Sequence, residues 1–197
     1  MGALAVVSNK HYTFEEYLKL EEQEHIRYEY YDGEAFARAG SSMNHSNIAY
    51  NINRSLNDAF RERECFSFQA DVKVELKKED VYVYPDVVLT CHADDIKDGY
   101  YIRNPLLIVE VLSPSTESYD RNVKWNRYRR LLSLRYFLFV SQQKPFVELY
   151  SRSGPNTLYQ YQAFDQMEEV IAFPDLQFNV SLRQVYGNIR FIEMPDK

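Results

Sequence analysis

The stretch "NPLLIVEVLSPST", from Asn104 to Thr116, places one charged side chain inside an otherwise apolar run. The segment "LLIVEVLS" is typical of a buried strand that ends before Pro114, and Glu110 lies in its middle. A carboxylate that leaves water without a partner is strongly disfavoured, so it either keeps its proton or lies next to a cation. The sequence therefore predicts a cation close to Glu110.

A second acid, Asp86, lies inside the preceding apolar segment, "VYVYPDVVLT", which contains residues 81–90. Asp86 follows Pro85, a residue that favours a bulge or the edge of a strand. If the two predicted strands are neighbours, Asp86 and Glu110 converge. Two close carboxylates need a raised pKa, a basic side chain or a hard divalent cation bound by oxygen ligands. A divalent metal ion would meet this need, whereas a structural ion pair remains the alternative.

The segment 118–132 is predicted to be a helix that carries a lysine toward these acids. Asp120, Lys124 and Tyr128 recur every four residues and share one face. An inward lysine could neutralise the carboxylates, or it could orient and help to deprotonate a water bound to a metal. The alternative is a lysine whose aliphatic stem packs at the edge of the core while its amine reaches water.

The charge of the chain is segregated. A net charge of −6 argues against a protein that coats nucleic acid non-specifically, because that mode requires a broad basic surface. Residues 120–135, by contrast, contain six basic side chains and only one acid. The basic residues are Arg121, Lys124, Arg127, Arg129, Arg130 and Arg135. Arg121 and Arg127 are predicted to contact nucleic-acid phosphates, with a solvated helix face as the alternative.

The N-terminal third predicts a helix, a hairpin and a second helix. "TFEEYLKL", residues 13–20, opens with a capping box, and the Asp32–Gly33 pair is typical of a type I′ β-hairpin. Apolar residues at intervals of three and four predict a helix over 44–63, with His45 facing inward at its first turn. The alternation in "CFSFQADVKVELKK", residues 65–78, predicts one half-exposed strand.

The C-terminal third predicts further strands at 135–140, 146–151, 158–162 and 170–173, and a final helix near 180–189. With no internal repeat or linker, these elements predict one α/β domain whose central mixed sheet is flanked by helices. Its expected limits are residues 12–192, with tails at 1–11 and 193–197.

Two further expectations concern the environment of the chain. It contains no run of about 18 apolar residues and no typical secretory leader, so a cytoplasmic protein with no membrane partner is expected. The two cysteines, Cys65 and Cys91, are expected to be reduced thiols without a function.

Several motifs carry a resemblance to a known family. Their order and spacing resemble those of a large bacterial family of putative restriction endonucleases, the Uma-type family of the PD-(D/E)XK nuclease superfamily. The similarity runs from about residue 12 to about residue 190. The motifs are "YTFEEYL", "RYEYYDGE", "NHSNI", "YPDVVLT", "LLIVEVLSPST" and "YDRNVKWNRY".

The resemblance implies a restriction-endonuclease-like fold, α/β with a central mixed sheet and an extra N-terminal hairpin. It implies that Asp86 and Glu110 surround Mg²⁺ or Mn²⁺. Glu29 matches an acid near the metal, and His45 matches a histidine that opens the second helix; both are secondary candidates. A solvated surface acid is the alternative for Glu29, and a packed, hydrogen-bonded histidine is the alternative for His45.

The chain departs from the superfamily pattern at two places. Leu112 stands two residues after the glutamate, where the superfamily often has lysine, and the resemblance assigns that role to Lys124 in the following helix. Ser141 and Gln142 stand where relatives commonly have Asp and Pro, a change expected to alter a turn and not the chemistry.

The function expected from these features is a metal-dependent endonuclease that cuts DNA, with Asp86, Glu110 and Lys124 as catalytic residues and a homodimer as the expected assembly. Two alternatives remain open. One is a catalytically inactive nucleic-acid-binding or assembly module on the same fold, and the other is a homodimeric interaction protein.

Overall fold

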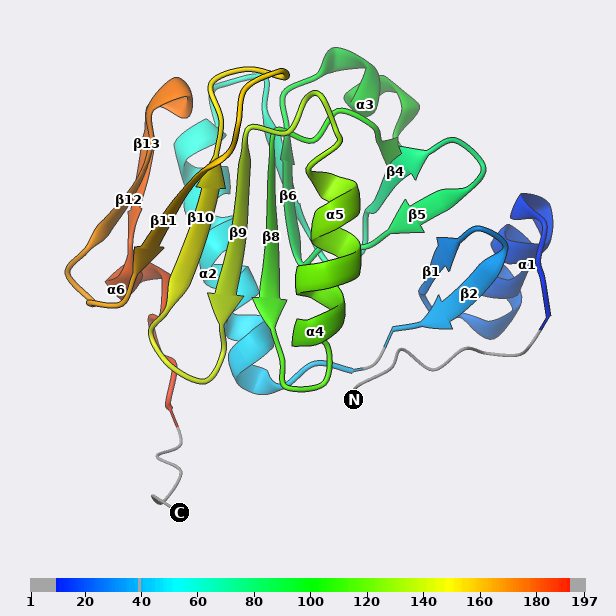
Figure 1. Ribbon diagram of the computed structural model, residues 1–197, viewed down its shortest axis with the longest axis horizontal. Coiled ribbons are helices and arrows are strands. Elements are labelled where there is room, and N and C mark those ends of the chain that lie inside the picture. Colours follow the sequence, from blue (N-terminus) through cyan, green and yellow to red (C-terminus); the bar gives the residue numbers. More distant parts are fainter. Residues whose placement is uncertain (1–9, 39, 192–197) are drawn as a thin grey trace.

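The computed structural model describes residues 10–38 and 40–191, and its largest sheet has six strands in the order β11-β10-β9-β8-β6-β3 (Figure 1). Strands β8 and β9 are parallel and the other neighbours are antiparallel, so the predicted mixed sheet is confirmed. The strands are β3 (Phe66–Gln69), β6 (Val87–Thr90), β8 (Leu107–Leu112), β9 (Tyr136–Ser141), β10 (Val147–Ser151) and β11 (Gln160–Phe164).

Different elements cover the two faces of this sheet. On one face lie the long helix α2 (Met43–Phe60), the hairpin β12 (Val170–Phe173) and β13 (Phe178–Ser181), the short helix η2 (Pro174–Leu176) and α6 (Leu182–Val185). The other face is covered by α4 (Glu117–Tyr119), the π-helical turn η1 (Asp120–Lys124) and α5 (Trp125–Tyr128). Helices therefore flank the sheet on both sides, as predicted.

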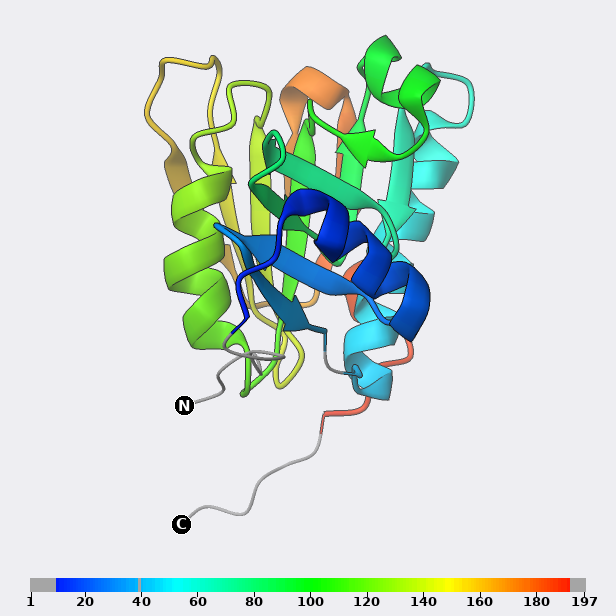
Figure 2. The same ribbon diagram turned by 90° about the vertical axis from the view of Figure 1, so that its right-hand side faces the viewer.

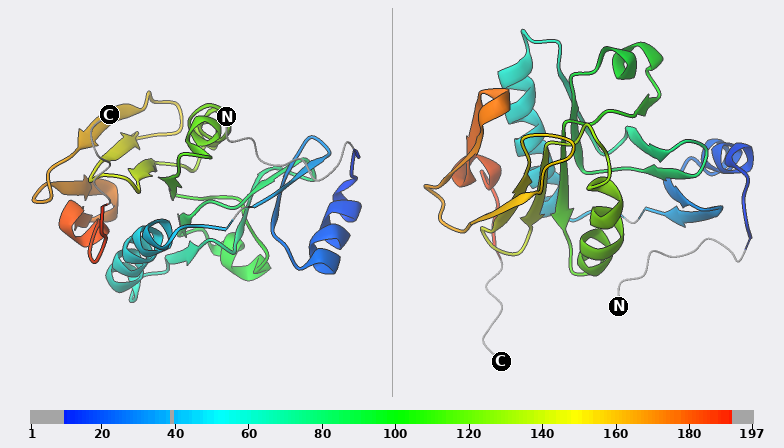
Figure 3. Two further views of the ribbon diagram at one scale, coloured as in Figure 1. Left: turned by 90° about the horizontal axis from the view of Figure 1, so that it is seen from below. Right: turned by 45° about the horizontal axis from the view of Figure 1, so that its top comes forward.

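A second sheet of five strands packs beside α4, η1 and α5, in the order β2-β1-β5-β4-β7. Helix α1 (Phe14–Glu24) covers its outer face through stacked rings, such as those of Tyr17 and Tyr30, whose centroids are 4.7 Å apart (Figure 2). Helix α1 and the β12–β13 hairpin lie at opposite ends of the molecule (Figure 3). The strands are β1 (Tyr28–Tyr31), β2 (Glu34–Ala37), β4 (Lys73–Lys77), β5 (Val81–Val83) and β7 (Tyr101–Ile102).

The local signals near the N-terminus are confirmed. The Thr13 hydroxyl accepts the Glu16 backbone N–H, and the Glu16 carboxylate accepts the Thr13 N–H, which completes the capping box. Asp32 and Gly33 have φ angles of 47° and 88°, the positive values that a type I′ turn requires. The extra N-terminal hairpin is thus β1–β2.

The prediction of one strand over residues 65–78 is wrong. This segment divides into β3 in the large sheet and β4 in the second sheet. Ala70 breaks it with a φ of 61°, a left-handed conformation that no glycine announces in the sequence. Phe66, the first residue of the edge strand β3, is 44% exposed.

Other element boundaries also differ from the predictions. The chain crosses from β5 to β6, and so from one sheet to the other, across Pro85. The predicted helix over 118–132 ends its helical path at Tyr128, and Leu132 is exposed. Strands β7 and β13 and helix α3 (Ala93–Asp98) were not predicted, because short elements carry little periodicity of their own.

The expectation of two reduced thiols is wrong as well. Cys65 and Cys91 form a disulfide. Antiparallel pairing places Phe66, the first residue of β3, opposite Thr90, the last residue of β6. Cys65 directly precedes Phe66 and Cys91 directly follows Thr90, so the two cysteines are neighbours and their bond links the two strands. The sequence separation of 26 residues conceals this proximity, which arises from strand pairing.

Two points concern the ends of the chain and the membrane expectation. The predicted C-terminal tail, 193–197, lies outside the described residues, as does the N-terminal tail, 1–11, apart from Lys10 and His11. Among the helices that the structure describes, none is both long and apolar enough to cross a membrane.

Candidate active site

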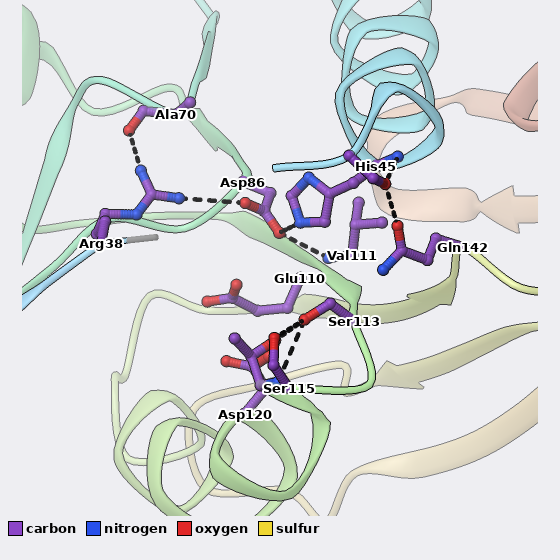
Figure 4. Close-up of polar contacts among 12 residues, drawn as sticks. Arg38, His45, Ala70, Asp86, Glu110, Val111, Ser113, Ser115, Asp120 and Gln142 are labelled. Atoms are coloured by element: carbon purple, nitrogen blue, oxygen red, sulfur yellow. Dashed lines mark hydrogen bonds and ion pairs between the residues drawn. The ribbon is translucent and has the colours of Figure 1, made fainter. Parts of the chain in front are cut away.

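The register of β6 and β8 places two acids opposite each other. Val87 pairs with Val109, so continuation by one residue puts Asp86 across from Glu110. The Val111 backbone N–H donates to Asp86 Oδ2 at 2.8 Å. The predicted convergence therefore occurs, and Figure 4 shows both carboxylates pointing toward the same region.

Lys124 reaches Glu110 from the helical side of the sheet. Its Nζ donates to Glu110 Oε1 and Oε2 at 3.2 and 3.3 Å. The same ammonium lies 3.3 Å from Asp120 Oδ1 and 3.0 Å from Glu29 Oε1. Asp120 and Lys124 bound the π-helical turn η1, a type of distortion that is frequent at functional sites. The cation expected beside Glu110 is thus Lys124, shared among three carboxylates.

Two tyrosines complete this buried cluster. The Tyr128 hydroxyl donates to Glu110 Oε1 at 2.7 Å, and the Tyr31 hydroxyl donates to Glu29 Oε2 at 2.9 Å. Glu29 is 1% exposed, so it is not a surface acid, and it belongs to β1 of the second sheet. Lys124 consequently joins the two sheets through ion pairs.

The charges in this cluster shift one another's protonation. Burial opposes the charge of Lys124, but Glu110, Glu29 and Asp120 outweigh it, so the pKa of Lys124 lies well above its ordinary value. Burial raises the pKa of Glu110 well above its ordinary value, and the nearby acids add to this effect against Lys124. The pKa of Asp120 is raised as well, mainly by burial. Three carboxylates and one ammonium thus favour retention of a proton within the cluster.

Asp86 has different partners. Its Oδ2 lies 3.2 Å from His45 Nε2, and its Oδ1 lies 3.3 Å from Arg38 Nη2 (Figure 4). Burial opposes ionisation, but His45, Arg38 and Lys124 outweigh it, so the pKa of Asp86 lies below its ordinary value. Ser42 caps α2 through the His45 N–H, which sets the first turn of the helix beside Asp86. His45 is therefore a hydrogen-bonding partner of Asp86.

These groups line a cavity of about 570 Å³. Asp86, Glu110, Lys124, Glu29 and His45 all belong to its wall. The wall also contains polar side chains from the loops and helix ends around the acids: Arg27, Arg38, Ser42, Ser113, Ser115, Thr116, Asp120 and Gln142. Five of the seven predicted site residues are therefore brought together.

The other two predicted residues, Arg121 and Arg127, do not line this cavity. Arg121 pairs with Glu117 at 2.8 Å and with Glu148. Arg127 lies 3.6 Å from Asp32 and 4.4 Å from the centre of the Tyr31 ring. Both arginines are half-buried in contacts within the chain.

The donor set is suited to a hard cation with few protein ligands. Asp86 and Glu110 supply carboxylate oxygens, the donors that Mg²⁺ prefers, and Mg²⁺ commonly uses one or two carboxylates while it keeps several waters. Within residues 10–38 and 40–191, no group of three or more His, Cys, Asp or Glu side chains is arranged to hold a metal. Two acids and substrate oxygens fit Mg²⁺ or Mn²⁺, whereas a full protein cage does not form.

Sequence reasoning did not identify three residues of this site as functional: Arg38, Asp120 and Tyr128. The spacing of four between Asp120, Lys124 and Tyr128 was a usable signal, because it places all three on one helix face. Arg38 follows β2 without a motif, and only tertiary folding brings it to Asp86. Gln142, a departure from the family pattern, accepts a hydrogen bond from Ser42 and lines the cavity, so that change reaches the site.

Comparisons with known proteins show the family of the chain. The model of a family described as "Putative restriction endonuclease" (Uma2) matches residues 14–184. Two uncharacterized proteins of Synechocystis sp. are 36% and 33% identical over 156 and 153 residues; the matches cover 78% and 77% of this chain, and 82% and 86% of the relatives.

A solved structure, described as a putative nuclease belonging to DUF820 from Anabaena variabilis, has the same fold. It superimposes with a TM-score of 0.66 at 19% identity and covers 88% of this chain and 97% of its own. With the mixed sheet, the flanking helices and the N-terminal hairpin, the restriction-endonuclease-like fold is confirmed. The chain belongs to the Uma2 family of putative restriction endonucleases.

Proposed function

We propose that this protein is a divalent-metal-dependent endonuclease that hydrolyses phosphodiester bonds of DNA. The observation that carries the proposal is the placement of Asp86 and Glu110 opposite each other on β6 and β8, with the Lys124 ammonium on Glu110. Paired carboxylates and a cation beside an open cavity are suited to phosphate chemistry.

Asp86 and Glu110 would hold Mg²⁺ or Mn²⁺ through their carboxylate oxygens. When bound, the ion polarises the scissile phosphate and lowers the pKa of the attacking water. His45 and the Val111 N–H orient Asp86, and the Tyr128 hydroxyl orients Glu110. These contacts keep both carboxylates aimed at one place before substrate arrives.

Lys124 acts in this proposal as an ammonium. Its raised pKa keeps it protonated, so its charge stabilises negative charge on the phosphate, and it positions the attacking water once one of its three N–H groups turns from a carboxylate to that water. Glu29 and Asp120 hold the lysine in place. A general base would have to come from another group or from the solvent.

The DNA backbone would reach the cavity past the basic side chains on its wall, Arg27 and Arg38. Arg121 and Arg127 would contact flanking phosphates only after exchanging their present acidic partners. A homodimer, which would bring two sites to one duplex, and a cytoplasmic location stay predictions.

One observation favours a second candidate, the catalytically inactive module. Each site acid already has a cationic or hydrogen-bonding partner: Arg38 and His45 on Asp86, and Lys124 on Glu110. A site neutralised by its own side chains can persist as a structural ion-pair network. Binding of a divalent ion separates the two candidates.

The test is a nicking assay on supercoiled DNA with Mg²⁺ or Mn²⁺. Asp86→Asn and Glu110→Gln should each reduce nicking at least about a hundredfold, because each removes a ligand charge. Glu75→Gln is the matched control: Glu75 is a mostly buried strand acid paired with Arg103 away from the cavity, and its loss should leave the rate unchanged. Nicking that persists in both site variants would reject the proposal.

A further inference from the structure

Arg38 contacts Asp86, one of the two acids of the site. Its Nη2 lies 3.3 Å from Asp86 Oδ1, and its Nη1 donates to the Ala70 carbonyl oxygen at 2.7 Å. Ala70 presents that oxygen from a left-handed conformation, with a φ of 61°, and donates its own N–H to the Asp86 carbonyl at 3.1 Å. The backbone beside Asp86 is thus shaped to hold the guanidinium on the carboxylate.

The position of Arg38 bears directly on metal binding. Asp86 Oδ2 already receives the Val111 N–H at 2.8 Å and lies 3.2 Å from His45 Nε2. A carboxylate oxygen has two lone pairs, so Oδ1 is the oxygen left for a metal ion. Arg38 uses one lone pair of that oxygen, so a metal ion bound through the other would lie within a few ångströms of the guanidinium.

A guanidinium and a divalent ion cannot share Oδ1 comfortably. The arginine side chain stays positively charged at any pH at which the protein is folded. Two positive charges a few ångströms apart repel strongly in a partly buried site. One cation has to leave when the other arrives.

The two cations of the site differ in their freedom to leave. The Lys124 side chain is 8% exposed and is held by three carboxylates, so its removal would leave buried charges unpaired. The Arg38 side chain is 23% exposed and lies on the cavity wall with one acidic partner, one carbonyl and the Tyr84 ring, whose centre is 5.6 Å from the guanidinium carbon. Arg38 therefore gives up fewer charged partners than Lys124 would when it turns into the cavity.

We propose that Arg38 is a gate on this site: it neutralises Asp86 in the metal-free protein, leaves Asp86 when a divalent ion binds, and then binds a phosphate oxygen of the DNA backbone. The last step rests on the proposed function, whereas the first two concern the metal alone. Metal and substrate would thereby bind cooperatively, because the arginine released by one becomes a ligand for the other.

The test measures Mn²⁺ affinity without DNA, by electron paramagnetic resonance and calorimetry. Arg38→Gln should bind Mn²⁺ about tenfold more tightly than wild type, because a repelling charge is gone. Arg27→Gln is the matched control, because Arg27 is a cation on the same cavity wall and pairs with Asp71 at 3.9 Å. The Mn²⁺ affinity of this variant should stay within about twofold of wild type.

The same variants are then tested with DNA in Ca²⁺. Arg38→Gln should weaken DNA binding several-fold, so its two effects have opposite signs, which a merely structural role would not produce. Circular dichroism melts verify folding, and Arg38→Met carries the same expectations if Arg38→Gln does not fold.

Mn²⁺ affinity equal to or weaker than wild type in the neutral variants would overturn the gate, as would the absence of Mn²⁺ binding in every protein. Tighter Mn²⁺ binding without DNA cleavage by the wild type would reject the nuclease and leave the gate in place. Metal-dependent cleavage by the wild type, with equal Mn²⁺ affinity of wild type and Arg38 variants, would overturn the gate and leave the nuclease proposal in place.

Discussion

Asp86 and Glu110 lie opposite each other on adjacent strands, yet different charged side chains pair with each of them. Asp86 is held by His45 of α2 and by Arg38 after β2, both of which line the cavity. Glu110 is held by Lys124 of η1, within a cluster that the second sheet closes. The pKa of Asp86 is lowered and that of Glu110 is raised.

This difference shows how one fold can give two acids of similar burial unlike chemistry. Asp86 has the Arg38 guanidinium to itself and also contacts His45 and the Val111 N–H, whereas the single ammonium beside Glu110 is divided among three carboxylates. These surroundings favour the ionised form of Asp86 and the protonated form of Glu110.

The largest expected effect comes from the shared cation. Lys124→Met should lower the free energy of unfolding by about 3–5 kcal/mol, because it leaves buried carboxylates unpaired. Urea denaturation measures the change. Arg129→Met, an exposed cation one turn beyond, should change stability by less than about 0.5 kcal/mol. Equal stability of the two variants would break the distinction between the Glu110 cluster and an ordinary charged surface.

The next effect concerns the Asp86 side, where the Cys65–Cys91 disulfide ties β3 to β6. Reduction should lower the free energy of unfolding by about 3 kcal/mol, since the bond closes a loop with a sequence separation of 26 residues. Hydrogen exchange should accelerate in β3 more than in β1. The double variant Cys65→Ser with Cys91→Ser should not respond to reductant; a protein whose β3 is equally protected in both states would contradict the expectation.

The third effect compares the two acids directly. Asp86→Asn should destabilise the protein by about 1–3 kcal/mol, because it removes an ionised partner of Arg38. Glu110→Gln should cost less, about 1 kcal/mol, because burial and the neighbouring acids already disfavour the charge of Glu110. Thermal and urea unfolding of both variants at pH 7 measure the difference, and equal losses would show that the environments are equivalent.

The smallest effect is a pH dependence. If Glu110 is a metal ligand, its raised pKa means that Mn²⁺ has to displace a proton from it. The Mn²⁺ affinity should then rise about tenfold per pH unit until Glu110 is ionised, and this rise should extend above the ordinary pKa of a glutamate, about 4.3. Calorimetry between pH 5 and 8 measures the slope. Glu110→Gln should bind weakly with a flatter profile, and an unchanged slope in that variant would assign the proton elsewhere.

The same pKa shifts give opposite signs for stability. Asp86, with its lowered pKa, contributes stability above the ordinary Asp range near 3.9, and this is lost as pH falls through its folded pKa. Glu110 binds its proton more tightly when folded, so its contribution declines as pH rises from about 4.3 through the raised value.

Much of the fold was readable from local pattern. The capping box at Thr13, the Asp32–Gly33 turn, the long helix over most of 44–63 and the strand around Glu110 each depend on residues close in sequence. The break at Ala70 was not readable, because the left-handed turn there is imposed by hydrogen bonds to Asp86 and Arg38.

The site was readable in part for the same reason. Glu110 within an apolar run required a cation, and the spacing of four placed Lys124 on the inward helix face. The approach of Glu29 and Arg38, from residues far upstream, depends on how the second sheet packs against the first.

By itself, the sequence determined that a buried acid needs a cation, that a helix carries a lysine inward, and that the chain alternates strands and helices, because these follow from solvation and from the periods of local structure. Tertiary structure alone decided which acids share Lys124, which arginine pairs with Asp86, and that the two cysteines form a disulfide. Charge interactions and covalent links act over a few ångströms of space, and sequence distance does not measure that.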